Sequence, residues 1–261
     1  MKTKKSYAVI TGASSGIGRA FALRLAKEGY SLILIARRQS RLLQVKAKVD
    51  PLMAPSNICL TYAMDVTDEH KCHELMHLLQ DQQVGIFINN AGFGDCSYFP
   101  EGSTDKELEM IDVNVKAMHL LTKLMIRKFI RQRYGYLLNV ASSAGLMPCG
   151  PYMATYYASK AYVVSLTRAI ARELKEKNSR VYIGCLCPGP VDTEFNQIAN
   201  VQFALPGITA GRCVDEAIAA MKKRRVIIIP TPLMKCSVLL SRLLPSVLTI
   251  PVISHQQKKK F

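Results

Sequence analysis

The residues whose spacing most clearly suggests a chemical function are the glycines of the segment Thr11 to Gly18, which reads T-G-A-S-S-G-I-G. An apolar run, Tyr7 to Ile10, precedes the segment and predicts a short buried strand. The residues that follow, Arg19 to Tyr30, have the apolar period of a helix, and Gly29 predicts its end. A glycine-rich turn between a strand and a helix gathers backbone N–H groups and the positive end of the helix at one point. Such a point binds pyrophosphate.

Each glycine of this segment has a distinct expected use. Gly12 suits the tight turn, Gly16 lets phosphates approach the backbone, and Gly18 lets the helix close onto the strand. A glycine pattern alone is also compatible with an ordinary connection between a strand and a helix. The rest of the chain therefore has to decide between these two interpretations.

A second apolar strand is expected over Ser31 to Ala36, and Arg37 and Arg38 follow it directly. This strand end, about 20 residues beyond the glycine turn, faces the adenosine ribose in dinucleotide-binding folds. A carboxylate there would bind the 2′-OH of NAD, whereas an arginine would attract the 2′-phosphate of NADP. No Asp or Glu occurs from residue 29 to residue 49, so the sequence favours NADP. The alternative is that both arginines only face solvent.

The composition limits the classes of protein to consider. The 261 residues fit one α/β domain, and 49% hydrophobic residues suffice for a sizeable core. The net charge of +16 has no nucleic-acid-binding motif beside it, so surface charge and an anionic cofactor explain it better than a nucleic-acid partner. The N-terminal sequence M-K-T-K-K-S predicts no secretory signal, and eight cysteines without C-x-x-C pairs predict reduced thiols and a cytoplasmic location.

Strands and helices are expected to alternate along the chain. Further strands are predicted over 58–64, 84–88, 135–141, 181–187 and 226–229, and helices over 67–83, 104–133 and 154–177. This spacing predicts a parallel sheet covered by helices on both faces. Asn114 lies inside the second of these helices, where it either caps a local kink or serves the site. His70, His73 and His77 share one helical face, but one helix would have to supply every ligand, so no metal site is expected.

The motifs taken together resemble the short-chain dehydrogenase/reductase family over roughly residues 5 to 230. The family's T-G-x-x-x-G-x-G matches Thr11 to Gly18, and its N-N-A-G matches Asn89 to Gly92. Its helix asparagine matches Asn114, its strand-end serine lies in V-A-S-S-A-G, and its Y-x-x-x-K matches Tyr156 and Lys160. Each motif is weak alone, but all of them in this order are specific.

The resemblance implies a Rossmann-like, doubly wound parallel sheet of about seven strands with helices on both faces, in one catalytic domain over residues 1–230. It also implies that NADP(H) is bound by a set of residues from the glycine turn and the strand ends. These residues are Gly12, Ser14, Ser15, Gly16, Ile17, Gly18, Arg37, Arg38, Asp65, Val66, Asn90, Ala91, Gly92, Tyr156, Lys160, Pro188, Gly189, Val191 and Thr193.

The same resemblance implies the catalytic roles. Reduction of a ketone needs a proton for the carbonyl oxygen, and Tyr156 would supply it. Lys160 lies one helical turn further on and, with the oxidised nicotinamide, should lower the pKa of Tyr156. A serine would polarise the carbonyl, and Asn114 would hold a water in the proton path.

The serine is ambiguous because the spacing departs from the family pattern. Ser142 has the expected distance to Gly145 but lies 14 residues before Tyr156, where the family has 13, whereas Ser143 meets only the second condition. A loop absorbs an inserted residue more easily than a strand end does. Ser142 is therefore the serine predicted to polarise the carbonyl.

The expected substrate is a bulky apolar ketone or alcohol. Apolar side chains expected around the centre are Phe93, Leu146, Met147, Met153, Phe195 and Phe203, and 194–207 resembles the family's mobile lid. A hydroxysteroid is the first choice. The alternatives are a 3-oxoacyl reductase, a general carbonyl reductase, and a non-catalytic NADP(H)-binding redox sensor.

The segment 231–261 is expected to form a helical, apolar extension. Its apolar run is interrupted by Lys235, Arg242, Pro245 and Pro251, which argues against a spanning helix. It could cover a sheet edge, pack in a homodimer or homotetramer, or lie on a membrane surface. Packing or oligomer contact is the preferred interpretation.

Overall fold

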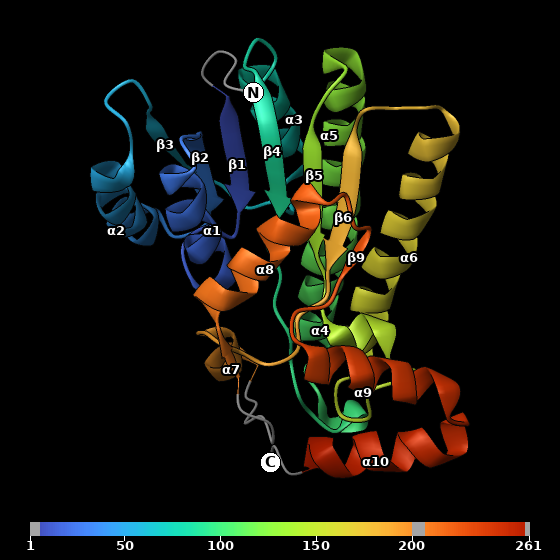
Figure 1. The fold of residues 1–261 in the computed structure, drawn as a ribbon. Helices are drawn as coiled ribbons and strands as arrows, with labels where there is room; N and C mark the ends of the chain where they lie inside the picture. The colour runs from blue at the N-terminus through green and yellow to red at the C-terminus, as the bar shows by residue number, and fades with distance from the viewer. Residues whose placement is uncertain (1–5, 200–206, 259–261) are drawn as a thin grey trace.

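A seven-stranded parallel sheet forms the centre of the computed structural model, which describes residues 6–199 and 207–258 (Figure 1). The strand order is β3-β2-β1-β4-β5-β6-β9, and every pairing in this sheet is parallel. All seven expected strands are confirmed, with ends that differ by at most one residue. They are β1 (Tyr7–Thr11), β2 (Ser31–Ala36), β3 (Cys59–Ala63), β4 (Val84–Asn89), β5 (Tyr136–Val140), β6 (Tyr182–Leu186) and β9 (Ile227–Ile228).

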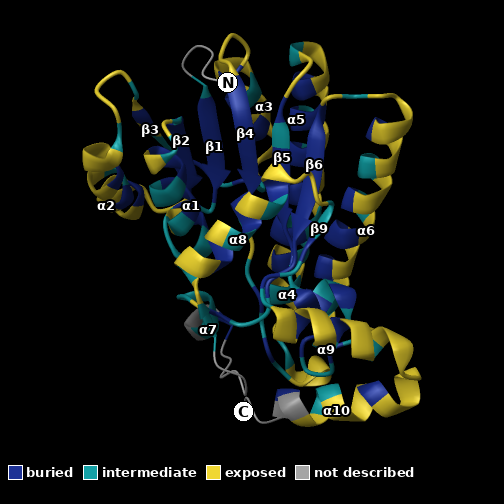
Figure 2. Ribbon diagram, viewed as in Figure 1, coloured by how far each residue is buried: buried dark blue, intermediate teal, exposed yellow. Residues whose placement is uncertain are grey.

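Helices cover both faces of the sheet, as expected, because alternate residues of each strand point to opposite apolar layers. In β1, Ala8 and Ile10 pack into one layer, and Tyr7 and Val9 pack into the other. The first layer is completed by α1 (Gly16–Lys27), α2 (Gln39–Val49) and α8 (Ala210–Lys222). The second is completed by α3 (Glu69–Leu78), α5 (Met118–Gln132) and α6 (Ala154–Glu176). Figure 2 shows the strands buried between these helices, whose outer faces are exposed.

The order of the strands reverses between β1 and β4. From β1 the chain first builds outward through β2 and β3, then crosses over and builds the other half from β4. In a parallel sheet, a crevice forms at the carboxyl ends of the strands on either side of such a reversal. The glycine turn follows β1 and the segment from Asn90 follows β4, so both lie at this crevice.

The prediction of a single long helix over 104–133 is wrong in one respect. The structure has α4 (Thr104–Ile111), a π-helical segment (Asp112–Ala117) and then α5. Asn114 lies in the π-helical segment, and its side chain bonds to neighbouring segments, which offers a reason for the change of helix type. The apolar period could not reveal it, because the period is almost unchanged by one wider turn.

Three further features complete the described chain. A two-stranded parallel pair of β7 (Val191–Asp192) and β8 (Ile208–Thr209), which the sequence did not predict, stands beside the short α7 (Phe195–Ile198). The helical extension is confirmed as α9 (Pro232–Leu243) and α10 (Ser246–Lys258). No described helix is both long and apolar enough to cross a membrane. The division of the chain at residue 230 stays a prediction.

Replacing Gly18 by Ala should destabilise the fold. A Cβ at this position would overlap the carbonyl oxygen of Gly12 and lie 2.7 Å from the side-chain nitrogen of Asn90. Overpacking against backbone costs about 1–3 kcal/mol, so we expect a lower melting temperature by calorimetry and weaker cofactor binding. The matched control is Gly211→Ala, because a Cβ on Gly211 in α8 meets nothing within 4 Å. Equal melting temperatures for the two variants would contradict the close packing of α1 on the glycine turn.

Candidate active site

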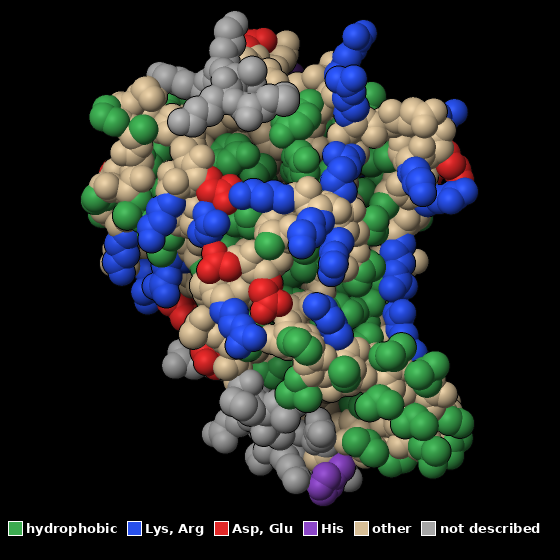
Figure 3. Space-filling model, viewed as in Figure 1, with side chains coloured by type: hydrophobic (Ala, Val, Ile, Leu, Met, Phe, Trp, Pro, Cys, Tyr) green, Lys and Arg blue, Asp and Glu red, His purple; other side chains and the backbone are tan. Residues whose placement is uncertain are grey.

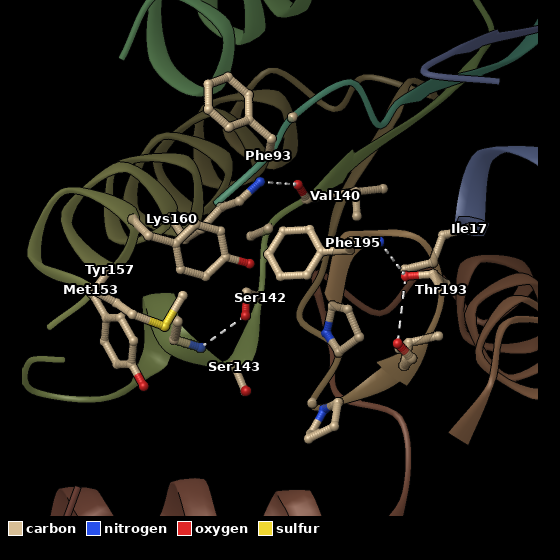
Figure 4. A pocket seen from close by; sticks show the side chains of 18 of the residues that line it. Ile17, Phe93, Val140, Ser142, Ser143, Met153, Tyr157, Lys160, Thr193 and Phe195 are labelled. Carbon is tan, nitrogen blue, oxygen red and sulfur yellow. Dashed lines mark hydrogen bonds between the residues drawn. The ribbon is translucent and has the colours of Figure 1, made fainter. Parts of the chain in front are cut away.

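A cavity of about 890 Å³ opens at the carboxyl ends of the strands. It is lined by the glycine turn, by the segments after β2, β4, β5 and β6, by α6, and by α9 and α10. Figure 4 shows part of it from close by. Most residues predicted to bind the cofactor line this one cavity: Gly12, Ser14, Ser15, Gly16, Ile17, Arg37, Arg38, Asp65, Val66, Asn90, Ala91, Gly92, Tyr156, Lys160, Pro188, Gly189, Val191 and Thr193.

The glycine turn is built as a cradle for an anion. Gly12 and Gly16 have φ values of 63° and 52°, a conformation that side chains with a Cβ rarely adopt. Helix α1 begins at Gly16 and has no acidic residue in its first turn, so its positive end faces the cavity uncompensated. Gly18 does not line the cavity, because it faces the carbonyl of Gly12 instead.

Thr11 holds the two halves of the crevice together, which the sequence analysis missed. Its buried hydroxyl oxygen accepts hydrogen bonds from the backbone N–H groups of Asn90 (2.9 Å) and Ala91 (3.0 Å). The side-chain amide of Asn90 donates a hydrogen bond in return to the backbone carbonyl oxygen of Thr11 at 3.0 Å. The signal was a polar residue at the end of an otherwise apolar strand, directly before the first glycine.

The two arginines after β2 have different surroundings. Arg37 pairs with Glu109 at 2.8 Å and lies 3.9 Å from Asp65. Arg38 donates a hydrogen bond to the hydroxyl of Ser14 in the glycine turn at 3.4 Å and pairs with Glu194 at 3.2 Å. Arg38 is therefore the arginine that is joined to the phosphate cradle, and carboxylates partly neutralise both arginines.

Tyr156, Lys160 and Ser142 meet at the wall of the cavity formed by α6 and the end of β5. The ammonium nitrogen of Lys160 donates to the carbonyl oxygen of Val140 at 3.2 Å and lies 5.8 Å from the centre of the Tyr156 ring. The side chain of Ser142 lies near enough to Tyr156 to influence the pKa of the phenol. The oxygen of Ser142 also accepts from the backbone N–H of Ala144 at 3.1 Å (Figure 4).

The expected lowering of the Tyr156 pKa by Lys160 and an oxidised nicotinamide stays a prediction. Burial raises the pKa of Tyr156 to about 12, and the side chain of Ser142 opposes this rise. Burial also lowers the pKa of Lys160 to about 8. The physical reason is that both groups are withdrawn from water, and desolvation penalises the charged form of each.

Between the two candidate serines, the influence of Ser142 on the pKa of Tyr156 favours Ser142. Ser143 also lines the cavity, but its backbone N–H donates to the carbonyl of Pro188 at 2.8 Å. In Figure 4 the Ser143 hydroxyl lies on the side of Ser142 that faces away from Lys160. The geometry thus supports the choice made from the length of the following loop, and the role of Ser142 itself stays a prediction.

Asn114 does not line the cavity. Its amide nitrogen donates to the carbonyl of Phe93 at 2.9 Å and to the hydroxyl of Ser159 at 3.1 Å, and its oxygen accepts from the N–H of Phe93 at 3.2 Å. These bonds tie the segment after β4 to α6. The side chain therefore positions other parts of the site, and its predicted hold on a relay water stays a prediction.

Glycines make room for the buried pair. A Cβ on Gly92 would lie 2.7 Å from the side-chain oxygen of Asn114 and 3.2 Å from the ammonium of Lys160. A Cβ on Gly94 would lie 2.8 Å from the ring of Phe195 and 3.0 Å from that of Tyr156. The sequence analysis missed Gly94, although a second glycine two residues after the N-N-A-G motif was a visible signal.

The apolar wall was predicted in part. Phe93, Met147, Met153 and Phe195 line the cavity as expected, whereas Leu146 packs in the core beneath α9 and Phe203 lies outside the described residues. The apolar lining also includes residues of the C-terminal extension, which the sequence analysis did not place there. These are Met234, Leu240, Leu244, Leu248, Val252 and Ile253.

Over residues 6–199 and 207–258, no group of three or more His, Cys, Asp or Glu is arranged to hold a metal ion. His70 instead lies 3.1 Å from the carboxylate of Glu74, one helical turn away. Six of the eight cysteines are buried.

A doubly wound parallel sheet with a glycine cradle at its strand reversal defines the class of dinucleotide-binding α/β proteins. The short chain dehydrogenase family model matches residues 6–202. The chain belongs to the short-chain dehydrogenase family.

Similar proteins agree with this assignment. A very-long-chain 3-oxoacyl-CoA reductase from Pyrenophora tritici-repentis is 33% identical over 205 residues, which are 77% of this chain and 59% of that protein. The chain thus spans about three fifths of the length of that curated relative. A short-chain dehydrogenase from Sphingobium yanoikuyae in complex with NADPH has a TM-score of 0.79 and 28% identity, covering 87% of this chain and 88% of its own. A family member from Burkholderia phymatum in complex with NAD has a TM-score of 0.81 and 25% identity, covering 92% and 94%.

Proposed function

We propose that this protein reduces the 3-oxo group of a long-chain acyl derivative with NADPH. The observation that carries the proposal is the meeting of buried Tyr156, Ser142 and Lys160 in an apolar cavity that also contains the glycine cradle. A proton donor, a polarising hydroxyl and an anion-binding turn are the groups that hydride transfer to a carbonyl requires.

The cavity residues fit a dinucleotide phosphate. The cradle of Gly12 and Gly16 would hold the pyrophosphate, because a Cβ on Gly16 would contact Thr193 and close the approach. Arg38, beside Ser14, would attract the 2′-phosphate, with Arg37 as a second cation. When bound, the nicotinamide would supply the hydride and, once oxidised, a positive charge.

The proton for the new hydroxyl would come from Tyr156. Because burial raises the pKa of Tyr156 to about 12, this phenol is protonated at neutral pH and is suited to donate. Ser142, which lies beside Tyr156, would donate to the same carbonyl oxygen and place it for the proton. The ammonium of Lys160, held by the carbonyl of Val140, would stabilise the phenolate that forms.

The acyl derivative is preferred to the hydroxysteroid expected first. Relatives named very-long-chain 3-oxoacyl-CoA reductases support it, at 33% and 35% identity, although each is longer than this chain. The apolar lining from Phe93 to α9 and α10 would accept the hydrocarbon chain of either substrate. The acyl proposal therefore depends mainly on similarity, and a substrate comparison must test it.

That comparison uses the purified full-length chain with NADPH and matched ketones. We expect higher kcat/KM for 3-oxoacyl thioesters, rising with chain length, than for 3-oxo or 17-oxo steroids. Faster turnover of steroids would restore the hydroxysteroid proposal. Tight NADPH binding without turnover of any ketone would instead favour a non-catalytic sensor.

Reduction should lose efficiency at alkaline pH. Burial lowers the pKa of Lys160 to about 8. Lys160 therefore carries its positive charge only below about pH 8. We therefore expect kcat/KM for NADPH, which reports the free enzyme, to be level near neutrality and to fall by about tenfold per pH unit well above 8.

A second lysine provides the control for this profile. Burial also lowers the pKa of Lys128, which lies on α5 outside the cavity and donates to the carbonyl of Gln80. Lys128→Met should keep the alkaline fall, whereas Lys160→Met should lose it together with most of the activity. A profile that stays level well above pH 8 in the unmodified protein would contradict the assigned role of Lys160.

A further inference from the structure

The outer surface of α9 and α10 is apolar, where a helical hairpin in water would be polar. Figure 3 shows hydrophobic side chains gathered over these two helices. We call these exposed residues the hairpin patch: Leu233, Leu239, Leu240, Leu243, Leu244, Val247, Leu248, Ile250 and Val252. A contiguous apolar surface of this kind marks an interaction site.

On helix α10 the polar residues Thr249 and Gln257 are buried, whereas several apolar residues are exposed beside Ser246 and His255. Thr249 and Gln257 are only 6% and 4% exposed, whereas Val247 and Val252 are 77% and 60% exposed. The Gln257 amide donates a hydrogen bond to the hydroxyl of Tyr157 at 2.7 Å, which fixes the polar side of the helix toward the cavity. This orientation is the one that a helix takes when its outer side meets an apolar medium.

The charge of the region selects the kind of partner. The sequence from 231 to 261 contains no Asp or Glu but five basic residues: Lys235, Arg242, Lys258, Lys259 and Lys260. Lys235 and Arg242 lie exposed on α9 itself. Two copies of this surface would repel each other, whereas an anionic surface would attract it.

The two helices are too short to cross a bilayer. With 12 and 13 residues, they are each about 20 Å long at about 1.5 Å per residue, against a hydrocarbon thickness of about 30 Å. Such helices lie in the plane of the interface, with the apolar side among the acyl chains and basic residues near the headgroups.

The hairpin patch is continuous with the mouth of the cavity. Leu240, Leu244, Leu248 and Val252 belong to the patch and also line the cavity. An apolar molecule that moves along the patch would therefore stay in contact with apolar side chains as it enters the cavity.

We propose that α9 and α10 bind the surface of a bilayer that contains anionic phospholipids, and that the cavity opens toward the lipid. Met234 and Val238 anchor α9 to the core, so the hairpin is a fixed part of the fold and presents the patch outward. Membrane binding is independent of the proposed function. Only the entry of an acyl substrate from the lipid into the cavity depends on the proposed function.

The test is co-sedimentation of the full-length protein with vesicles of phosphatidylcholine, with or without about 30% phosphatidylglycerol. The variant Leu243→Glu/Val247→Glu alters two patch residues that do not line the cavity. The matched control, Leu43→Glu/Leu78→Glu, adds the same charge at similarly exposed leucines on α2 and α3. Circular dichroism and NADPH binding verify that both variants fold.

We expect the unmodified protein and the control to bind anionic vesicles, and high salt to weaken the binding. The patch variant should bind at least about tenfold more weakly, because charge replaces buried apolar surface. No vesicle binding by the unmodified protein, or equal binding by both variants, would overturn the proposal. A dimer that only the patch variant dissociates, without vesicle binding, would assign the patch to a second copy instead.

Turnover of a short, water-soluble ketone separates this proposal from the proposed function. Vesicle binding with no turnover would contradict the reductase and leave membrane docking intact. Turnover without vesicle binding would do the reverse. If both hold, the patch variant should keep its rate on the short ketone and lose it on a long-chain ketone presented in vesicles.

Discussion

Tyr156→Phe should abolish ketone reduction while leaving the protein able to bind NADPH. The phenol is buried in the cavity wall beside Ser142, so the loss of its hydroxyl removes the proton donor without removing the ring. General acid catalysis contributes on the order of 10²–10⁴-fold, and we expect kcat to fall by at least that factor. NADPH affinity, measured by fluorescence titration, should change by less than about threefold, because the phosphate cradle is untouched.

The matched control is Tyr162→Phe, on the same helix. The Tyr162 hydroxyl contacts His119 at 2.7 Å and does not line the cavity. This variant should keep the kcat of the unmodified protein. If Tyr156→Phe retained substantial turnover, the proton would have to come from another group, and the proposed mechanism would be wrong.

Replacing either arginine after β2 by Asp should shift cofactor preference from NADPH toward NADH. The substitution exchanges attraction to the 2′-phosphate for repulsion, and hydrogen bonds to charged groups are worth about 1.5–3 kcal/mol, or roughly 10- to 150-fold in affinity. Arg38→Asp should have the larger effect, because Arg38 contacts Ser14 of the cradle, whereas Arg37 points to Glu109. Dissociation constants for both cofactors provide the measurement.

Arg172→Asp is the control, because Arg172 lies on α6 away from the cavity and pairs with Glu176 at 2.7 Å. It should leave the ratio of NADPH to NADH affinity unchanged. An unchanged ratio in both Arg37→Asp and Arg38→Asp would mean that these arginines only face solvent, and the NADPH preference would have no support in this region.

The sequence allowed most of the sheet to be predicted because its strands are buried on both sides. Ser31–Ala36, for example, is apolar after its first residue, and strand and prediction coincide. The predicted strand ends then indicated where the crevice lies, because parallel strands bring their carboxyl ends to one edge of the sheet. The glycine turn and the Tyr156–Lys160 pair could therefore be placed at one site before any coordinates were known.

Predictions that depended on local packing were less successful. The expected effect of Lys160 on Tyr156 considered charge but not burial, which raises the pKa of Tyr156 to about 12 and lowers that of Lys160 to about 8. The π-helical turn around Asn114 depends on its bonds to Phe93 and Ser159, distant in sequence. The apolar tail had a clear composition, but only its folding beside α6 reveals that it lines the cavity and turns apolar residues outward.

Transfer of deuterium from NADPH to a ketone tests the central claim most directly. The protein would be incubated with NADPH deuterated at C4 of the nicotinamide, on either face, and a long-chain 3-oxoacyl thioester, and the product analysed by mass spectrometry. We predict one deuterium at the new carbinol carbon from one of the two labelled cofactors, and none with Tyr156→Phe. Absence of labelled product with the unmodified protein, across acyl and steroid ketones, would contradict the account.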